Sequence, residues 1–172
     1  MNYHKITKDD MLNGSGLRVV LWLSGCNHNC YKCQNPQTHD CNSGIPFDVS
    51  AKEEIFEELK KDYIKGITFS GGDPLHENNL IEVNNLCLTI KENFPTKDIW
   101  LYTGNTFEEI NRASNCNNNI IRQSIVSMCD VLVDGKYIES LSDKKYHWAG
   151  STNQRVIDVK ETLNLNKIVL YA

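Results

Sequence analysis

Apolar and polar positions alternate along the chain in a pattern that predicts strands followed by helices. Residues 17–23 are almost continuously apolar, as a strand buried on both faces should be. Shorter β-rich runs follow at 66–69, 98–102 and 131–133, and a last short strand is expected at 167–171. These runs predict the strands of one sheet.

Helical periodicity fills the segments between these runs. A capping box that begins at Ser50 predicts the start of a first helix, and a second capping box begins at Thr106. A further helix is expected over 120–128. The apolar face of the first helix consists of Ile55, Phe56, Leu59 and Tyr63. The apolar face of the next helix, which Pro95 ends, consists of Leu80, Val83, Cys87, Ile90 and Phe94.

Strands that alternate with helices predict an α/β fold in which a parallel sheet is joined by right-handed crossovers. Cys87 lies on the apolar face of a helix, so we interpret it as a core residue. The length of 172 residues is enough for one domain, 1–172, with a sizeable core.

Composition and charge exclude several classes of function. With 40% hydrophobic and 23% charged residues the chain is an ordinary globular protein, and its 18 basic against 22 acidic residues form no basic run that would predict binding to nucleic acid. No apolar stretch approaches the roughly 20 residues that span a bilayer. Seven cysteines, an odd number, and the lack of a signal segment predict a reducing, cytoplasmic location.

Three of the cysteines are the strongest functional signal. Cys26, Cys30 and Cys33 have the spacing C-x3-C-x2-C and directly follow the first apolar run. Thiolates are soft ligands that hold zinc or iron–sulfur clusters. Because a 4Fe-4S cube has four irons, three thiolates leave one iron open to a small molecule. The spacing therefore favours a cluster that performs chemistry.

Other interpretations of the triplet remain open at this level. A structural zinc site would need a fourth ligand, for which His28 and His39 are candidates, but no second ligand cluster follows. Cys41 lies in a polar stretch and is interpreted as a loop thiol. A ferredoxin-like electron carrier would require a fourth cysteine ligand.

Glycine-rich clusters follow the other predicted strands. Residues 70–74 (Ser-Gly-Gly-Asp-Pro), 103–104 (Thr-Gly) and 134–136 (Asp-Gly-Lys) each come directly after an apolar run, as the cysteines do. Glycines after strands are commonly turn residues. However, the carboxyl ends of parallel strands are where α/β proteins bind ligands, and adjacent glycines let a backbone approach a ligand closely. We therefore expect one site at this edge of the sheet.

Together, the cysteine spacing and the Gly71-Gly72-Asp73-Pro74 motif resemble those of the radical S-adenosylmethionine enzymes. Within that superfamily the chain is similar to the glycyl-radical-enzyme activases that act on anaerobic ribonucleoside-triphosphate reductase. The stretches that carry this narrower resemblance are 13–18, 70–76, 132–136 and 150–155. The resemblance implies a partial (β/α) barrel of mainly parallel strands.

The resemblance also implies cofactors and the residues that bind them. Cys26, Cys30 and Cys33 are the implied ligands of one 4Fe-4S cluster, whose open iron binds S-adenosylmethionine. The implied contacts to S-adenosylmethionine are Lys32, Cys33, Gln34, Gly71, Gly72, Asp73, Asp134 and Lys136. Asp73, or the carbonyl groups of the glycines before it, would hold the methionine ammonium. Many members of the superfamily have an aromatic residue where this chain has Lys32.

The implied reaction is reductive cleavage of S-adenosylmethionine, followed by removal of a hydrogen atom from a glycine of a partner. The implied partners are the large subunit of an anaerobic ribonucleoside-triphosphate reductase and reduced flavodoxin or a similar electron donor. An activase of pyruvate formate-lyase type and a small-molecule enzyme such as a carboxy-deazaguanine synthase are the alternatives. The tail, 160–172, matches no motif and is expected to form an extra edge strand or a docking segment.

Overall fold

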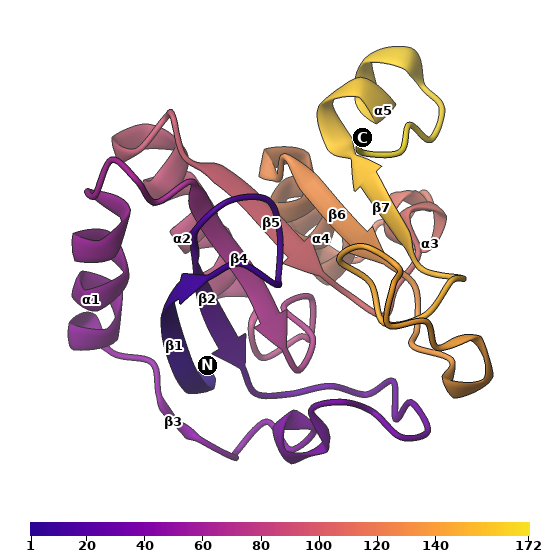
Figure 1. Cartoon of the computed structure of the whole chain (residues 1–172), viewed down its shortest axis with the longest axis horizontal. Coiled ribbons are helices and arrows are strands. Elements are labelled where there is room, and N and C mark those ends of the chain that lie inside the picture. The colour runs from indigo at the N-terminus through magenta and orange to yellow at the C-terminus, as the bar shows by residue number, and fades with distance from the viewer.

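The computed structural model describes all 172 residues and arranges them around one seven-stranded sheet (Figure 1). The strand order is β3-β1-β2-β4-β5-β6-β7. The strands are β1 (Asn2–Asp10), β2 (Arg18–Leu23), β3 (Ile45–Pro46), β4 (Gly66–Gly71), β5 (Asp98–Tyr102), β6 (Val131–Asp134) and β7 (Arg155–Asp158). The α-helices are α1 (Val49–Leu59), α2 (Leu80–Asn93), α3 (Phe107–Asn111), α4 (Asn117–Met128) and α5 (Val159–Leu165).

The four central strands, β2, β4, β5 and β6, are parallel, which confirms the four main strands predicted from the sequence. Three further strands extend the sheet. β1 pairs antiparallel with β2, β3 with β1, and β7 with β6. The sheet is open, because β3 and β7 are two separate edges.

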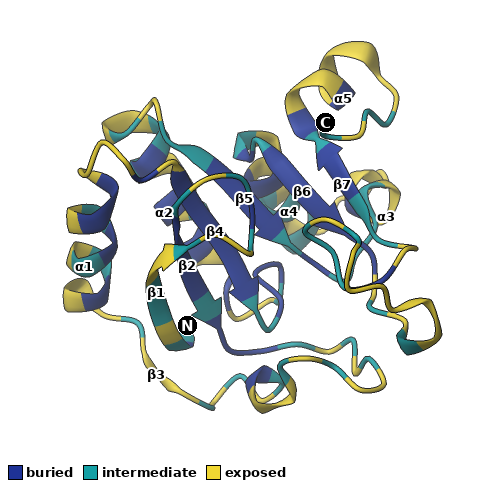
Figure 2. Cartoon of the chain, viewed as in Figure 1, coloured by how far each residue is buried: buried dark blue, intermediate teal, exposed yellow.

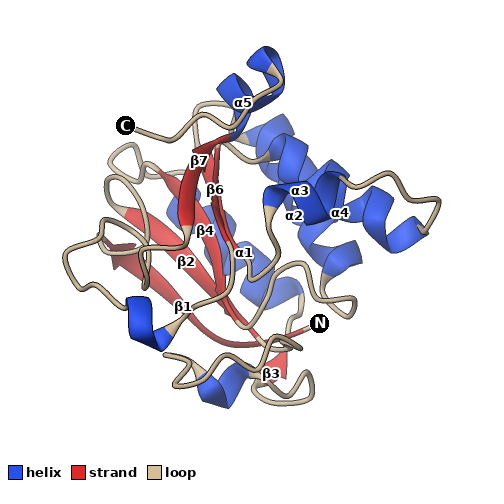
Figure 3. Ribbon diagram, turned by 90° about the vertical axis from the view of Figure 1, so that its right-hand side faces the viewer, coloured by secondary structure: helices blue, strands red, loops and turns tan.

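The strand order explains where the helices lie. The parallel strands follow one another across the sheet without a reversal of direction, so successive right-handed crossovers place their helices on the same face. Figure 3 shows α1, α2 and α4 gathered on that side of the strands. We call it the helix face. The other side, covered by loops and the end of the chain, is the loop face.

Side chains alternate between these two faces along each strand. The main apolar core lies on the helix face, where the strands contribute Val19, Leu21, Leu23, Ile67, Phe69, Ile99, Leu101, Leu132 and Ile157. A smaller cluster on the loop face contains Trp100, Val131, Val133 and Val156. The central strands are buried on both sides, as Figure 2 shows, which accounts for their nearly continuous apolar sequence.

A buried arginine fastens a loop over the loop face. The guanidinium of Arg18, which is fully buried, donates to the hydroxyl of Thr68 at 2.6 Å, to the carboxylate of Asp98 at 2.7 Å and to the carbonyl of Ser15 at 2.7 Å. The Thr68 hydroxyl in turn donates to the carbonyl of Asn13 at 2.7 Å. Residues 13–15 are thereby held against β2, β4 and β5.

The first helix begins and ends earlier than the sequence predicted. Asp48, not Ser50, is its N-cap, because the Asp48 backbone is extended and its carboxylate accepts a hydrogen bond from the Ala51 N–H at 2.9 Å. The helix ends at Leu59, so Tyr63 lies outside it and is exposed. The predicted helix over 120–128 begins three residues earlier, at Asn117.

Two predictions on the helices are confirmed. Thr106 forms the predicted capping box with Glu109, each side chain bonding the backbone N–H of the other residue. Cys87 is fully buried in the main core. None of the helices combines the length and apolar character that a membrane crossing requires.

The strand predicted at 167–171 is present only as one antiparallel bridge at the β7 edge, so the tail extends the sheet much less than expected. The carboxylate of Asp158 caps α5 by accepting from the Glu161 N–H at 2.9 Å, so the chain turns into a helix after β7. The tail then folds back along β7, where Leu170 bridges Ile157. Two backbone hydrogen bonds flank this bridge, from the Asp158 N–H to the Val169 carbonyl at 2.9 Å and from the Tyr171 N–H to the Val156 carbonyl at 2.8 Å. Tyr171 packs edge-on against Trp100 with ring centroids 5.1 Å apart.

Candidate functional site

The loops after the four parallel strands meet at the carboxyl edge of the sheet, as the sequence predicted. They enclose a cavity of about 380 Å³. Each of the four strands contributes a segment to its wall. The wall includes Cys26, Cys30 and Cys33 after β2, Ser70, Gly71 and Gly72 at the end of β4, Tyr102, Thr103 and Gly104 at the end of β5, and Gly135 after β6.

The three cysteines lie on a long loop that runs from the end of β2 to β3. Backbone hydrogen bonds close its base, from Gly25 N–H to the Thr38 carbonyl at 2.7 Å and from Cys26 N–H to the His39 carbonyl at 3.0 Å. Burial raises the pKa of the Cys26 thiol to about 11, and the nearby Asp73 and the other two cysteines add to this shift. All three cysteines line the same cavity.

The donor set fits an iron–sulfur cluster. Three soft thiol ligands share one cavity wall, and Cys41 does not line it. No three His, Cys, Asp or Glu side chains converge on one point as the ligands of a single metal ion do. In a 4Fe-4S cube each thiolate binds a different iron, and metal binding deprotonates the thiol. Cys26, Cys30 and Cys33 would therefore hold the cluster.

Two glycines at the end of β4, Gly71 and Gly72, are required because backbone segments lie in close contact there. A Cβ atom on Gly72 would lie 2.5 Å from the carbonyl oxygen of Gly25, and one on Gly71 would lie 2.7 Å from the backbone nitrogen of Leu23. Gly71 also has a φ of +100°. The β4 turn therefore packs directly against the start of the cysteine loop. These glycines were expected either as turn residues or for close approach to a ligand, and the structure adds contact between two backbone segments.

Asp73 is buried, and protein donors occupy its carboxylate. Oδ2 accepts hydrogen bonds from His28 Nε2 at 2.6 Å and from the Thr103 hydroxyl at 2.9 Å. Oδ1 accepts from the Leu75 N–H at 2.8 Å. The side chain lies behind the cavity wall, whereas Gly71 and Gly72 lie on it.

Asp134 and Lys136 also lie away from the thiols. The Asp134 carboxylate is buried, pairs with the guanidinium of Arg155 and accepts from the Phe107 N–H at 2.7 Å. Lys136 is exposed beside a separate hollow on the far side of Gly135. Asp134 thereby joins α3 to β7.

Lys32 and Gln34 are placed differently from each other. Lys32 is exposed, has a φ of +53° and donates to the Glu139 carboxylate at 3.1 Å, outside the cavity. Gln34 lines the cavity next to Cys33. Of the sequence-predicted contacts beyond the cysteines, the structure brings Gln34, Gly71 and Gly72 together with the thiols.

Sequence reasoning missed several residues of the cavity wall. Trp22 and Tyr102 come from the loop face of the strands, and alternation along β2 and β5 was the signal that could have placed them there. Gln154 joins two turns of the wall. Its side chain accepts from the Gly150 N–H at 3.0 Å and donates to the Gly135 carbonyl at 2.9 Å.

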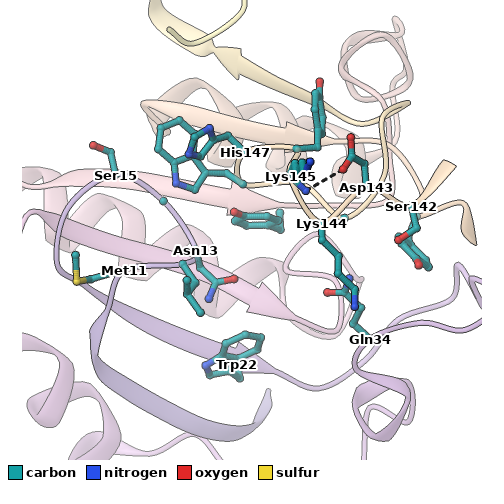
Figure 4. A pocket seen from close by; sticks show the side chains of 18 of the residues that line it. Met11, Asn13, Ser15, Trp22, Gln34, Ser142, Asp143, Lys144, Lys145 and His147 are labelled. Carbon is teal, nitrogen blue, oxygen red and sulfur yellow. Dashed lines mark hydrogen bonds between the residues drawn. The ribbon is translucent and has the colours of Figure 1, made fainter.

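A larger hollow of about 1100 Å³ adjoins the cavity and shares Trp22, Gln34 and Tyr102 with it. Its walls are the loop before β2 and the loop before β7. Figure 4 shows Met11, Asn13 and Ser15 on one side, and Ser142 to Lys145 on the other. The cavity with the thiols is therefore open toward a wide groove on the loop face.

Comparison with known proteins defines the class of this site first. Residues 12–157 match a family model described as a 4Fe-4S single cluster domain. This match covers most of the chain and contains all three cysteines of the triplet. It favours the iron–sulfur interpretation over a structural zinc site.

Curated relatives narrow the class to one family. The chain is 42% identical to a protein of Enterobacteria phage T4 over 156 residues, which make up 91% of this chain and 93% of the relative. It is 40% identical to a protein of Escherichia coli K12, over 91% and 97% of the two chains, and 40% identical to one of Vibrio cholerae, over 90% and 96%. The chain belongs to the family of these relatives, the anaerobic ribonucleoside-triphosphate reductase-activating proteins.

Proposed function

We propose that this protein activates an anaerobic ribonucleoside-triphosphate reductase by generating a glycyl radical on its large subunit. The observation that carries the proposal is the common cavity of Cys26, Cys30 and Cys33 at the carboxyl edge of the sheet, in a chain whose relatives bear the name of this activity. The enzyme is then a radical S-adenosylmethionine oxidoreductase formed by one domain, 1–172. We infer that its open sheet, with all crossovers on one side, corresponds to the partial (β/α) barrel of that superfamily.

The cofactors are a 4Fe-4S cluster, held by the three cysteines, and S-adenosylmethionine. When bound and reduced, the cluster would supply the electron for reductive cleavage of S-adenosylmethionine. The protein binds and orients S-adenosylmethionine and excludes water from it. The carbonyl groups of Gly71 and Gly72 are suited to hold the methionine ammonium, because they lie on the cavity wall and the Asp73 carboxylate behind them is already hydrogen-bonded.

The remaining contacts are assigned by their positions. Gln34 and Tyr102 line the cavity and are suited to contact the ligand directly. Asp134 supports the wall through its pair with Arg155 rather than by touching the ligand. Lys32 and Lys136 are exposed and do not line the cavity, so we assign them no direct contact with S-adenosylmethionine.

The wide groove beside the cavity is proposed as the entrance for the glycine-bearing segment of the reductase. Its volume of about 1100 Å³ exceeds that of the thiol cavity, and it shares Trp22, Gln34 and Tyr102 with that cavity. An open groove suits an extended segment of a large partner, whereas a small substrate would need more enclosing side chains. This argues against a carboxy-deazaguanine synthase.

We also propose reduced flavodoxin, or a similar low-potential carrier, as electron donor and the cytoplasm as location. A reduced cluster and seven cysteines without a disulfide suit a reducing compartment. An activase of pyruvate formate-lyase type is the second candidate function, but the relatives compared above all carry the name of a reductase activator.

Electron paramagnetic resonance tests the proposal. The protein, reconstituted without oxygen with iron and sulfide and then reduced, should produce a glycyl radical signal with S-adenosylmethionine only when the large reductase subunit of the same organism is added. A pyruvate formate-lyase of that organism is the control and should give no signal. Equal activation of the lyase would assign a different target, and turnover of a small molecule without a glycyl signal would remove the activase function.

A further inference from the structure

The turn that carries the cysteines has little internal support. Between Cys26 and Cys33 the backbone makes one hydrogen bond within the turn, from the Cys33 N–H to the Cys30 carbonyl at 3.1 Å. Asn29 and Lys32 have φ values of +48° and +53°, a region that lysine in particular rarely adopts. Such residues persist only where the surrounding structure holds them. The turn therefore depends on contacts from outside.

Two side chains of the turn make such contacts. Lys32 pairs with Glu139, but more than half of the Lys32 side chain is exposed, and exposed pairs contribute little to stability. His28, halfway between the first two cysteines, bonds Asp73 through Nε2 at 2.6 Å, and the Asp73 side chain is only 3% exposed. The buried contact is the stronger of the two.

Asp73 is itself fixed by its neighbours. Its Oδ2 atom also accepts hydrogen bonds from the Thr103 hydroxyl at 2.9 Å and from the Gly104 N–H at 3.3 Å, both after β5. Its own N–H donates to the Gly25 carbonyl at 2.7 Å. One carboxylate therefore links the loops that follow β2, β4 and β5.

The glycine at position 104 provides independent support. A Cβ atom there would lie 2.4 Å from the imidazole ring of His28, although the backbone of Gly104 does not have a positive φ. Glycine is thus needed at this position to leave room for the ring. The site thus provides His28 with a buried hydrogen-bond partner, Asp73, and with space for its ring beside Gly104.

We propose that His28 is a positioning residue for the cluster: its bond to Asp73 holds the cysteine turn against the sheet edge, so that the thiols face one cavity. Asp73 then serves as the fixed point of this attachment and does not bind the methionine ammonium through its side chain. The inference rests on the proposed function only in taking the three thiols as cluster ligands.

The test compares two histidines that fasten the same loop. His28→Ala removes the attachment beside the thiols. His4→Ala is the matched control, because His4 Nε2 bonds the hydroxyl of Ser43 at 2.9 Å at the far end of the loop. His28→Gln is the rescue variant, since its amide nitrogen can donate to Asp73 from a similar reach. All proteins are reconstituted anaerobically, and iron release to excess chelator is followed by absorbance.

His28→Ala should release iron about 10-fold faster than the wild type, the scale seen when a residue that orients metal ligands is lost. His28→Gln should stay within about 3-fold of the wild type, and His4→Ala should match it. Thermal unfolding of the iron-free proteins shows whether the fold is retained. The proposal is overturned if His28→Ala retains iron as the wild type does, if His4→Ala loses it equally fast, or if folded His28→Gln does not restore retention.

These measurements involve no reductase. If the wild-type protein holds its cluster by way of His28 but never activates a reductase, the proposed function fails and the positioning role stands. Should iron-free His28→Ala prove unfolded, His28→Gln decides: retention of iron near the wild-type rate supports the role, and rapid loss overturns it.

Discussion

The helix face and the loop face of the sheet are built from the same strands but differ in chemistry. The helix face carries the apolar core of 25 residues, which includes none of the thiols of the triplet. The loop face carries a buried arginine, aromatic rings and two hollows. In β4, Phe69 points into the core, whereas Ser70 lines the thiol cavity.

This difference shows how a small chain separates stability from chemistry. Alternation along a strand lets consecutive residues serve opposite requirements. Apolar burial on one side supplies the free energy of folding, and the other side keeps polar groups, glycines and open space for ligands. Substitutions on the two faces should therefore affect different measurements.

The largest effect is expected from the cysteines. Replacing Cys26, Cys30 or Cys33 by Ala should abolish the cluster and all cleavage of S-adenosylmethionine, because in the proposed site each thiolate would bind its own iron. The melting temperature of the iron-free protein should hardly change, since these residues lie outside the core. Cys41→Ala is the control and should keep about four irons per chain, measured by chemical analysis. Stoichiometric zinc in anaerobically purified protein would contradict this prediction.

The opposite outcome is expected on the helix face. Phe69→Ala should lower the free energy of unfolding of the iron-free chain by about 3–5 kcal/mol, because the ring is fully buried. Tyr102→Phe, on the loop face of the adjacent strand, should change it by less than about 1.5 kcal/mol. Urea titrations followed by circular dichroism compare the two. Similar losses in both variants would break the distinction between the faces.

Gly72 lies where the turn after β4 contacts the start of the cysteine loop. Gly72→Val should displace the cysteine loop, because a Cβ atom would collide with the Gly25 carbonyl oxygen. We expect this variant to lose iron during gel filtration while its circular dichroism spectrum stays close to that of the wild type. If the glycine served ligand approach alone, iron content would be normal and only the affinity for S-adenosylmethionine would fall.

The smallest effect concerns an ion pair that belongs to neither face. Hydrogen bonds from Arg155, at 2.9 and 2.7 Å, lower the pKa of Glu108 below its ordinary value of 4.5. A lowered pKa in the folded state means that ionised Glu108 stabilises the fold above about pH 4.5 and that this contribution is lost as the pH falls through the folded-state pKa. Glu108→Gln should thus lower Tm by up to about 2 °C near pH 7.

The same comparison of Tm values at low pH tests whether the pKa of Glu108 is lowered in the folded protein. Near pH 3 the Tm values of Glu108→Gln and the wild type should approach each other, since the carboxylate is then losing its charge in both states. Glu57→Gln removes an exposed pair with Lys60 on α1 and serves as the control. A Tm difference that grows in acid would contradict the direction of the pKa shift.

The sequence predicted the central part of the fold well, for a physical reason. Parallel strands buried on both faces leave nearly continuous apolar runs, and β2, β4, β5 and β6 were recognised by them. The outer strands lack this signal. β1 is mostly polar and partly exposed, and β7 has only four residues, so neither differed clearly from a loop.

The candidate site could be predicted in its position but not in its contacts. The order of the strands places the cysteines and the glycine turn at one edge, which follows from the pattern alone. Whether a carboxylate faces a ligand or a neighbouring side chain depends on pairings across long sequence separations. Asp73 bonds His28, 45 residues away, and Asp134 pairs with Arg155, 21 residues away. No local pattern contains that information.

The separation of the triplet from the main core has a consequence for protein that has lost its cluster in the cell. Since no thiol of the triplet belongs to the core, damage to the cluster by oxygen should leave a chain that is still folded. Quality-control proteases recognise unfolded chains, so inactive molecules are expected to accumulate beside active ones. The abundance of the protein would then overstate its activity, and inactive copies that keep an intact groove would compete with active copies for the reductase.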